Sequence, residues 1–304
     1  MELLYFFESI RMPVLNEFML LITRLGEETA LLVVALILFW CVDKKKGYYV
    51  LFVGFFGLVA NQFLKLLCRV PRPWILDPDF TILEAARDAA TGYSFPSGHS
   101  QSAVGLFGCL AVSTKNRWVR WSAIAIAVLV PVSRMYLGVH TPADVLVGSC
   151  MALILVFVLR KPVLEGKEGT MKFLLIALTT LSLGFLNYVE LSVFPADMDA
   201  HNLQSGVKNA YTVVGCMAGL GTVYYIEKEH IQFRTEAVWW AQILKCLLGF
   251  GIVLLVKEGL RSPLEALFAG HMAARAVRYC LMVIVAGCIW PLTFRWFQKL
   301  GVKK

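Results

Sequence analysis

The sequence predicts an all-α fold, a bundle of helices that crosses a membrane several times. Its 304 residues are 58% hydrophobic, and their mean hydropathy of +0.67 is too high for a water-soluble domain. Long apolar runs alternate with short polar connections along most of the chain. Because such runs are typical of transmembrane helices, we expect a polytopic membrane protein without a soluble domain.

Nine apolar runs are candidates for these helices. Each is about long enough, alone or with its flanks, to cross a hydrocarbon core ~30 Å thick, although the first and third are short. Before them, residues 1–25 carry apolar side chains at helical spacing with charged ones between, which predicts a helix lying in the membrane interface. The runs cover residues 29–42, 47–67, 100–113, 118–135, 143–159, 171–188, 207–226, 238–256 and 277–297.

The charges of the connections orient the bundle. Lysine and arginine gather in alternate connections, at residues 44–46, 115–120 and 160–167. Because positively charged connections stay in the cytoplasm, the remaining connections and the N terminus are predicted to lie outside. The net charge of +8 then reflects the positive cytoplasmic connections and favours attraction to anionic membrane lipids. No nucleic-acid partner is expected. We expect a multi-pass protein of a bacterial cytoplasmic membrane.

Three short polar stretches lie on the predicted outer side. Ionisable side chains in a bilayer cost about 2.5–3.5 kcal/mol each on insertion scales, so several at one face imply a shared anionic ligand or an ion-pair network. Because consecutive spans alternate in direction, the second and fourth spans end at that face, and the third and fifth spans begin there. The stretches are Lys65 with Arg72-Pro73, Pro96-Ser97-Gly98-His99, and Ser133-Arg134 with His140 and Asp144.

The residue types in these stretches suit phosphoryl transfer. His140 and Asp144 are four residues apart, so a carboxylate would hold one imidazole nitrogen and leave the other as a nucleophile. His99 would protonate the departing alkoxide, because the ordinary pKa of histidine lies near 6.5. Charge builds on the equatorial phosphate oxygens during transfer, and three cations could clamp them. These cations are Lys65, Arg72 and Arg134.

Two helix starts are predicted beside these residues. Ser97 can serve as the N-cap of a helix that begins at Gly98, and Thr141 precedes a proline, which is favoured at the first helical position. Free backbone amides at a helix N-terminus bind phosphate, and the helix dipole adds ~0.3–1 kcal/mol. Both helix ends are therefore expected at the site.

These motifs resemble the signature of the type 2 phosphatidic acid phosphatase superfamily, the lipid phosphate phosphatases. That signature reads Lys-x6-Arg-Pro, Pro-Ser-Gly-His and Ser-Arg-x5-His-x3-Asp, and the present chain matches it without departure between Lys65 and Asp144. The resemblance implies a phosphatase that needs no metal or other cofactor. It also implies a phosphohistidine on His140, supported by Asp144, with His99 as general acid. The implied phosphate ligands are Lys65, Arg72, Ser97, Gly98 and Arg134.

The resemblance also predicts how the chain is organised. It implies a six-helix phosphatase core followed by about three additional C-terminal transmembrane helices, in one membrane domain over residues 1–304. Within it we expect an interfacial helix over 1–25, the catalytic core over 26–190 and the additional helices over 191–304. A nine-span plan with an outward site is similar to that of sphingosine-1-phosphate phosphatase and glucose-6-phosphatase.

A site at the bilayer surface favours a lipid phosphate monoester as substrate, such as phosphatidic acid or a sphingoid-base phosphate. Two alternatives remain open. One is a phosphatase for polyprenyl diphosphates such as undecaprenyl diphosphate, and the other is a phosphotransferase that passes the phosphoryl group to a lipid or sugar hydroxyl. The residue pattern does not identify the lipid tail.

Two further features lie beside these motifs. Residues 81–90 are compatible with a short helix that either covers the site as a lid or forms a solvated connector. A second basic cluster precedes the last predicted span, and it could widen a positive entrance for an anionic head group. Its members are Lys257, Arg261, His271, Arg275 and Arg278.

Overall fold

The computed structural model describes residues 1–196 and 198–300, and in this range the regular structure is helical. The chain forms two compact units. The first contains residues 1–34, 49–167 and 193–206, and the second contains residues 35–48, 168–192 and 207–304. The expected all-α membrane fold is confirmed, and the motif residues all belong to the first unit.

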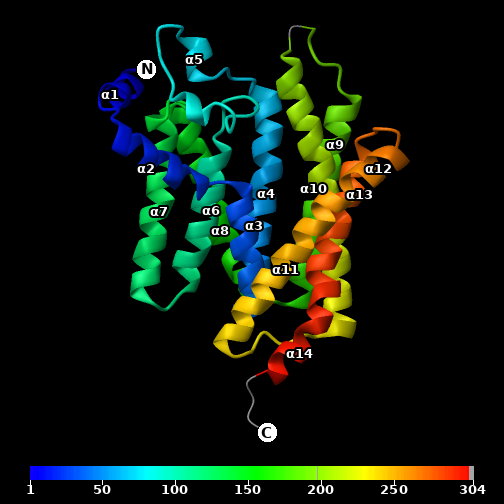
Figure 1. Cartoon of the computed structure of the whole chain (residues 1–304). Coiled ribbons are helices and arrows are strands. Elements are labelled where there is room, and N and C mark those ends of the chain that lie inside the picture. The colour runs from blue at the N-terminus through cyan, green and yellow to red at the C-terminus, as the bar shows by residue number, and fades with distance from the viewer. Residues whose placement is uncertain (197, 301–304) are drawn as a thin grey trace. The chain divides into compact units, whose positions relative to one another are not determined.

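The helices follow the predicted runs closely and add short elements between them (Figure 1). They are α1 (Glu2–Ser9), α2 (Pro13–Arg24), α3 (Glu28–Ile37), α4 (Lys44–Cys68), α5 (Pro73–Leu76), α6 (Gly98–Ser113), α7 (Arg117–Tyr136), α8 (Pro142–Glu165), α9 (Glu168–Leu191), α10 (Ala200–Ile226), α11 (Trp239–Gly259), α12 (Arg261–Leu267), α13 (Ala273–Ile284) and α14 (Phe294–Lys299).

The number of helices fit to span a membrane is smaller than the nine runs suggest. Among the described residues, six helices are long and apolar enough to cross, or seven if the pair α2 and α3, bent by 54°, forms one broken span. Helices α6 and α10 form where the third and seventh spans are expected but are not among these. Helix α6 has only 16 residues, about 24 Å at 1.5 Å per residue, and α10 carries polar residues, glycines and tyrosines along its length.

The N-terminal segment forms two helices instead of one. Helix α1 ends at Ser9 and α2 begins at Pro13, where proline occupies the first helical position because its missing N–H is not needed there. One face of these helices packs against α7 through Met19, Tyr136 and Leu137. Several apolar side chains remain on the surface, among them Val14 with 81% of its area exposed.

Helix α6 lies at the centre of the first unit, packed against α7 and α8 (Figure 1). Its central part, from Ser100 to Phe107, is buried. Close approach between α8 and the start of α6 depends on Gly148, because a Cβ atom there would come within 2.5 Å of the Ser97 carbonyl oxygen. This contact brings the N-termini of the two helices together, and it positions the site.

The second unit contains α9, most of α10 and all of α11 to α14. Polar groups are paired in its interior. The Trp40 indole donates to the Ala286 carbonyl oxygen across 2.9 Å, and the buried Lys245 ammonium donates to the Trp40 carbonyl oxygen across 2.9 Å. Lys44 forms an ion pair with Glu227. These bonds join residues 35–48 to the C-terminal helices of the same unit.

Candidate active site

The three motifs meet at one end of the first unit. Lys65 lies in the last turns of α4, His99 in the first turn of α6 and Arg134 in the last turn of α7. Arg72 caps the start of α5, and His140 lies in the connection between α7 and α8, so each charged group stands at a helix end. Lys65, Arg72, Arg134, His140 and Asp144 are all buried.

The carboxylate of Asp144 is fixed by two hydrogen bonds. Its Oδ2 accepts from the Ser94 hydroxyl across 2.6 Å and from the Thr141 backbone N–H across 2.7 Å. The Thr141 hydroxyl accepts in return from the Asp144 backbone N–H, which completes a capping box at the start of α8. The predicted start of this helix is thus confirmed. The same Oδ2 lies 3.6 Å from His140 Nδ1, close enough for electrostatic stabilisation but longer than a hydrogen bond.

His140 presents its other nitrogen to Arg72. Arg72 Nη1 lies 2.9 Å from His140 Nε2 and 3.4 Å from Nδ1, and because a guanidinium can only donate, the shorter contact favours the acceptor lone pair on Nε2. The proton of the neutral imidazole is then on Nδ1, facing Ser94 and Asp144. Burial, followed by the positive charges of Arg72, Arg134 and Lys65, lowers the pKa of His140 well below 6.5. The imidazole is therefore neutral at neutral pH, with its lone pair directed at a cation.

Lys65 and Arg72 both hold the chain segment that precedes α6. The Lys65 ammonium donates to the carbonyl oxygens of Tyr93 and Ser94. Arg72 donates from Nη2 to the Thr91 carbonyl oxygen across 2.7 Å and from Nε to the Gly92 carbonyl oxygen across 3.1 Å. These four residues form a wall of the site.

The structure corrects the expectation that residues 81–90, which precede this wall, form a short helix. In place of a helix, this stretch forms a single 3-10 turn at Glu84–Ala86. Two of its residues hold it against neighbouring segments. The Leu83 backbone N–H donates to the Leu137 carbonyl oxygen across 3.1 Å, and the Arg11 guanidinium donates to the Thr81 carbonyl oxygen across 2.9 Å. The stretch therefore packs on the connection that carries His140 and on the N-terminal segment.

Arg134 is fully buried, with 0% of its area exposed, and only part of its guanidinium is bonded. Nη1 donates to the Thr23 hydroxyl across 2.7 Å, while Nε and Nη2 have no hydrogen-bond partner among the described residues. His99 Nε2 is also buried without a partner. Buried donors without acceptors are costly, so these atoms indicate the place of an anionic ligand. Arg134 thus leaves two donor nitrogens open and His99 one ring nitrogen, while Lys65 and Arg72 hold residues 91–94.

The start of α6 has the predicted N-cap. The Ser97 hydroxyl accepts from the Ser100 backbone N–H at 3.4 Å and from the Ser100 hydroxyl at 2.9 Å. Asn61 donates from its amide nitrogen to the Pro96 carbonyl oxygen across 3.3 Å, and its own side-chain oxygen has no partner in the described chain. A Cβ atom on Gly98 would lie 3.6 Å from that oxygen. This distance is an ordinary van der Waals contact, so the Asn61 oxygen does not by itself require glycine at position 98.

Three site residues were missed by reasoning from the sequence. Ser94 bridges His140 and Asp144, Thr23 holds Arg134, and Asn61 holds the chain before α6. Asn61 lies within a mostly apolar helical run, where a polar residue is a signal that could have found it, whereas Thr23 lies in an amphipathic helix and gives no such signal. The described residues contain no group of three His, Cys, Asp or Glu side chains that could hold a metal ion.

Comparison with known families matches two parts of the chain. Residues 46–164 match the family described as PAP2 superfamily, and residues 211–303 match the family described as PAP2 superfamily phosphatase, transmembrane extension. The first match contains the three motifs, and the second covers all of α11 to α14 together with most of α10. The expected division into a phosphatase core and additional C-terminal helices is confirmed.

Individual relatives agree with these matches. Undecaprenyl-diphosphatase BcrC of Bacillus subtilis (strain 168) is 32% identical over 146 residues, 47% of this chain and 72% of the relative. Phosphatidylglycerophosphatase B of the same organism is 36% identical over 166 residues, 50% of this chain and 76% of the relative. An undecaprenyl-diphosphatase of Sulfolobus acidocaldarius is 31% identical over 137 residues, 44% of this chain and 64% of the relative.

These relatives support the superfamily but do not support the narrower resemblance to sphingosine-1-phosphate phosphatase and glucose-6-phosphatase. No solved structure gives a significant match to the chain.

Proposed function

Because this chain belongs to the PAP2 superfamily of membrane phosphatases, we propose that it removes the terminal phosphate of a polyprenyl diphosphate at the site around His140. Two of the three relatives above carry the name undecaprenyl-diphosphatase. This substrate was an alternative in the sequence analysis, and we now prefer it to the lipid phosphate monoester expected there. The proposal places the chemistry in residues 26–190 and treats residues 191–304 as an addition to it.

The proposal rests on the protonation state and the surroundings of His140. Its neutral imidazole keeps a lone pair on Nε2, beside one arginine, while a second arginine nearby has buried nitrogens without partners. A diphosphate brings the anion that these cations lack. When its terminal phosphate enters, Arg72 can exchange Nε2 for a phosphate oxygen, and the freed lone pair then faces phosphorus.

The first chemical step transfers the phosphoryl group to the enzyme. Nε2 of His140 forms a bond to the terminal phosphorus, and the bond from phosphorus to the bridging oxygen breaks, releasing the polyprenyl phosphate. His99 donates a proton to that oxygen. The imidazole becomes a phosphorylated cation, which the nearby Asp144 carboxylate stabilises. Arg134 and the amides at the start of α6 stabilise the charge on the phosphate oxygens.

The second step returns the enzyme to its starting state. Water attacks phosphorus while the P–N bond to His140 breaks, and His99 takes the proton that the water loses. Inorganic phosphate leaves, and His140 recovers its lone pair. No cofactor is required in either step, so the proposal keeps the expectation that none is used.

The test is phosphate release by the purified protein in detergent or nanodiscs. Undecaprenyl diphosphate, phosphatidylglycerophosphate, phosphatidic acid, a sphingoid-base phosphate and glucose 6-phosphate are compared at equal concentration. The proposal expects the highest kcat/KM for undecaprenyl diphosphate and complete loss of turnover in His140→Ala. A clear preference for another substrate overturns the choice of tail, and turnover near the normal level in His140→Ala overturns the nucleophile.

A second candidate is phosphatidylglycerophosphate, because the relative that acts on it by name has the highest identity of the three, 36%. The substrate panel decides between the two. Transfer to a lipid or sugar hydroxyl is tested in the same assay by adding candidate acceptors. Phosphorylated acceptor without release of inorganic phosphate would establish a phosphotransferase instead of a hydrolase.

We place the site on the outer face of a bacterial cytoplasmic membrane, because the connections rich in lysine and arginine alternate with those that carry the motifs. Reporter fusions test this placement. A periplasm-active reporter after residue 140 and a cytoplasm-active reporter after residue 116 should both give signal. The reverse pattern would turn the site toward the cytoplasm.

A further inference from the structure

A second basic pocket lies in the C-terminal extension, away from the motif residues in sequence. Its volume is about 550 Å³, within the range of small-molecule sites. Its lining residues come from the end of α11, from α12, from the start of α13 and, with Lys208, from α10. Its basic lining residues are Lys208, Lys257, Arg261, His271, Arg275 and Arg278. They include the whole second basic cluster that the sequence indicated.

The lining carries more positive than negative charge. Five lysine or arginine side chains face two glutamates, a surplus of three positive charges with histidine neutral. Each glutamate is already paired, Glu258 with Lys257 at 3.5 Å and Glu265 with Arg261 at 3.3 Å. Among the described residues, Arg275 and Arg278 form no ion pair with either glutamate. Like charges held close together are unfavourable unless an anion neutralises them.

Two of the arginines are held in place before any ligand binds. Arg275 Nε donates to the Thr212 hydroxyl across 2.6 Å, and its guanidinium lies 5.2 Å from the centre of the Tyr279 ring. The Arg278 guanidinium lies 5.6 Å from the centre of the same ring. Preorganised guanidinium groups lose less entropy when they bind a ligand, and their planar forks match phosphate oxygens.

Arg278 gives an independent sign that the pocket binds an anion. It is 92% buried, with 8% of its area exposed, yet its Nε has no hydrogen-bond partner among the described residues. A buried guanidinium nitrogen without a partner, on an arginine that lines a positively charged pocket, is a donor that an anion could satisfy.

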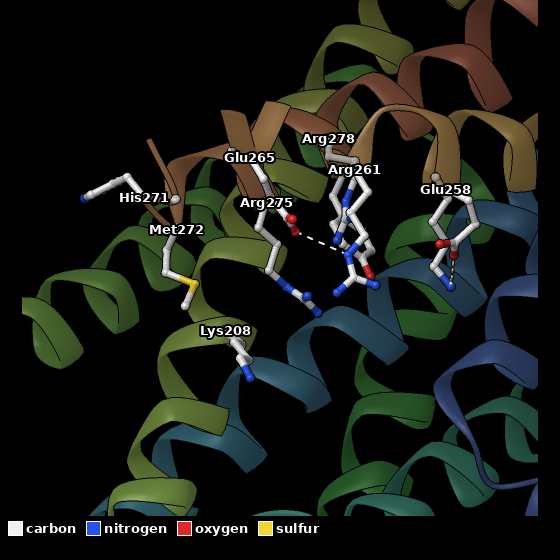
Figure 2. A pocket seen from close by; sticks show the side chains of 12 residues that line it. Lys208, Glu258, Arg261, Glu265, His271, Met272, Arg275 and Arg278 are labelled. Atoms are coloured by element: carbon white, nitrogen blue, oxygen red, sulfur yellow. Dashed lines mark hydrogen bonds and ion pairs between the residues drawn. The ribbon is translucent and has the colours of Figure 1, made fainter. Parts of the chain in front are cut away.

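The close view shows which side chains form the cradle. In Figure 2, Arg261, Arg275 and Arg278 extend to the side on which Lys208 lies, while His271 points away from them. His271 serves a different purpose, because its Nδ1 accepts a hydrogen bond from the Ala273 backbone N–H across 3.1 Å at the start of α13. The cradle therefore consists of three arginines and one lysine.

We propose that this pocket is a second anion site, which binds a phosphate-bearing head group through Arg261, Arg275, Arg278 and Lys208. Phosphate fits better than a carboxylate because its several oxygens can accept from three separate guanidinium groups at once. The pocket is larger than one phosphate requires, so the ligand carries a diphosphate or a further polar group. The pocket shares no lining residue with the site around His140, and the proposal does not depend on the substrate proposed for that site.

Two probes distinguish a free anion from a lipid. In the first arm, the full-length protein in phosphatidylcholine nanodiscs is titrated with methylenediphosphonate, a non-hydrolysable diphosphate, by calorimetry. In the second arm, the protein in detergent is offered phosphatidylglycerol, a phosphodiester that a monoester phosphatase does not consume, and retained lipid is counted by native mass spectrometry. The variants are Arg275→Gln and, separately, the exposed Arg261→Gln. Arg295→Gln is the control, since Arg295 is an exposed arginine outside the pocket.

We expect at least one probe to bind Arg275→Gln and Arg261→Gln about tenfold more weakly than the unchanged protein, with Arg295→Gln unaffected. Loss of diphosphonate binding identifies a free anion, and loss of retained lipid identifies a membrane head group. The proposal is wrong if both pocket variants match the unchanged protein in both arms, or if Arg295→Gln weakens binding equally. Phosphate release, measured on the same preparations, should stay normal in all three variants, so failure of the pocket proposal is distinguishable from failure of the proposed function.

Discussion

Arg72 donates a hydrogen bond to His140 Nε2 across 2.9 Å, so one residue of the proposed phosphate clamp covers the nitrogen proposed to attack phosphorus. The other nitrogens of Arg72 are bonded to the carbonyl oxygens of Thr91 and Gly92. Only Nη1 has to change partner when a phosphate binds. The arrangement keeps the imidazole oriented before substrate arrives, with its Nδ1 beside Asp144.

Arg72→Lys should lower kcat strongly although it keeps the positive charge. A lysine ammonium cannot reach the Thr91, Gly92 and Val139 carbonyl oxygens and also the phosphate, because it is a single point donor. We expect a loss of about 10²–10³-fold, the usual cost of removing one transition-state donor. Steady-state phosphate release measures it. A loss below tenfold would mean that a positive charge is sufficient for catalysis and that the planar guanidinium group is not needed.

The pH profile should follow the lowered pKa of His140. Burial and the neighbouring cations disfavour the protonated imidazole, and the neutral form is the nucleophile, so activity is present above the folded-state pKa and is lost below it. The acidic limb of kcat/KM, which reports the free enzyme, should therefore lie below pH 6.5. Arg72→Gln removes one of those cations and should move the limb to higher pH. A limb at or above pH 6.5 in the unchanged protein contradicts this account.

Much of the site follows from the sequence because its motifs are short and stand at helix ends. The spacing of His140 and Asp144 and the proline after Thr141 determine a local geometry, and helix α8 starts at Pro142 as expected. Because consecutive helices run in opposite directions, their order alone predicts that Lys65 and Arg134 lie at the same end of the bundle. These features depend on residues close together in the chain or on simple alternation.

Features that depend on distant contacts could not be predicted in the same way. Thr23 meets Arg134 only because α2 packs on α7, 111 residues later in the sequence. Helix α6 has only 16 residues, and contacts with α7, α8 and α4, which are distant or unspecified in sequence, bury most of its surface. Residues 81–90 have helical propensity, but contacts with Leu137 and Arg11 hold them in a turn and an extended chain instead.

Ser94→Ala should reduce kcat by about tenfold and leave KM unchanged. The Ser94 hydroxyl donates to Asp144 across 2.6 Å and lies 3.4 Å from His140 Nδ1, so it positions the pair without reaching phosphate. Loss of one buried hydrogen bond costs about 0.5–1.5 kcal/mol. Ser182→Ala is the matched control, because Ser182 is equally buried but bonds only to the Leu178 carbonyl oxygen. Equal effects in both variants would reduce Ser94 to a structural role.

His99→Ala should slow substrates with poor leaving groups far more than substrates with good ones. Its buried Nε2 has no partner in the described chain, which leaves it available to the departing oxygen. A diphosphate releases a weakly basic phosphate, whereas a monoester releases a basic alkoxide that needs a proton. Rates for both classes, measured with an aryl phosphate as an additional good leaving group, decide the matter. Equal losses across the series would remove His99 from the acid role.

Thr23→Val tests the link between the N-terminal segment and the site. Valine has nearly the shape of threonine, but it cannot accept from Arg134 Nη1, and the fully buried guanidinium would then lose its described partner. Leaving this group unbonded should cost about 1–3 kcal/mol of stability in the empty protein. A bound phosphate compensates by taking up the freed donor, so the loss of thermal stability should shrink when vanadate, a phosphate analogue, is added. A destabilisation that vanadate leaves unchanged would show that Arg134 does not face the anion, and Thr29→Val on the following helix α3 controls for loss of a helical threonine alone.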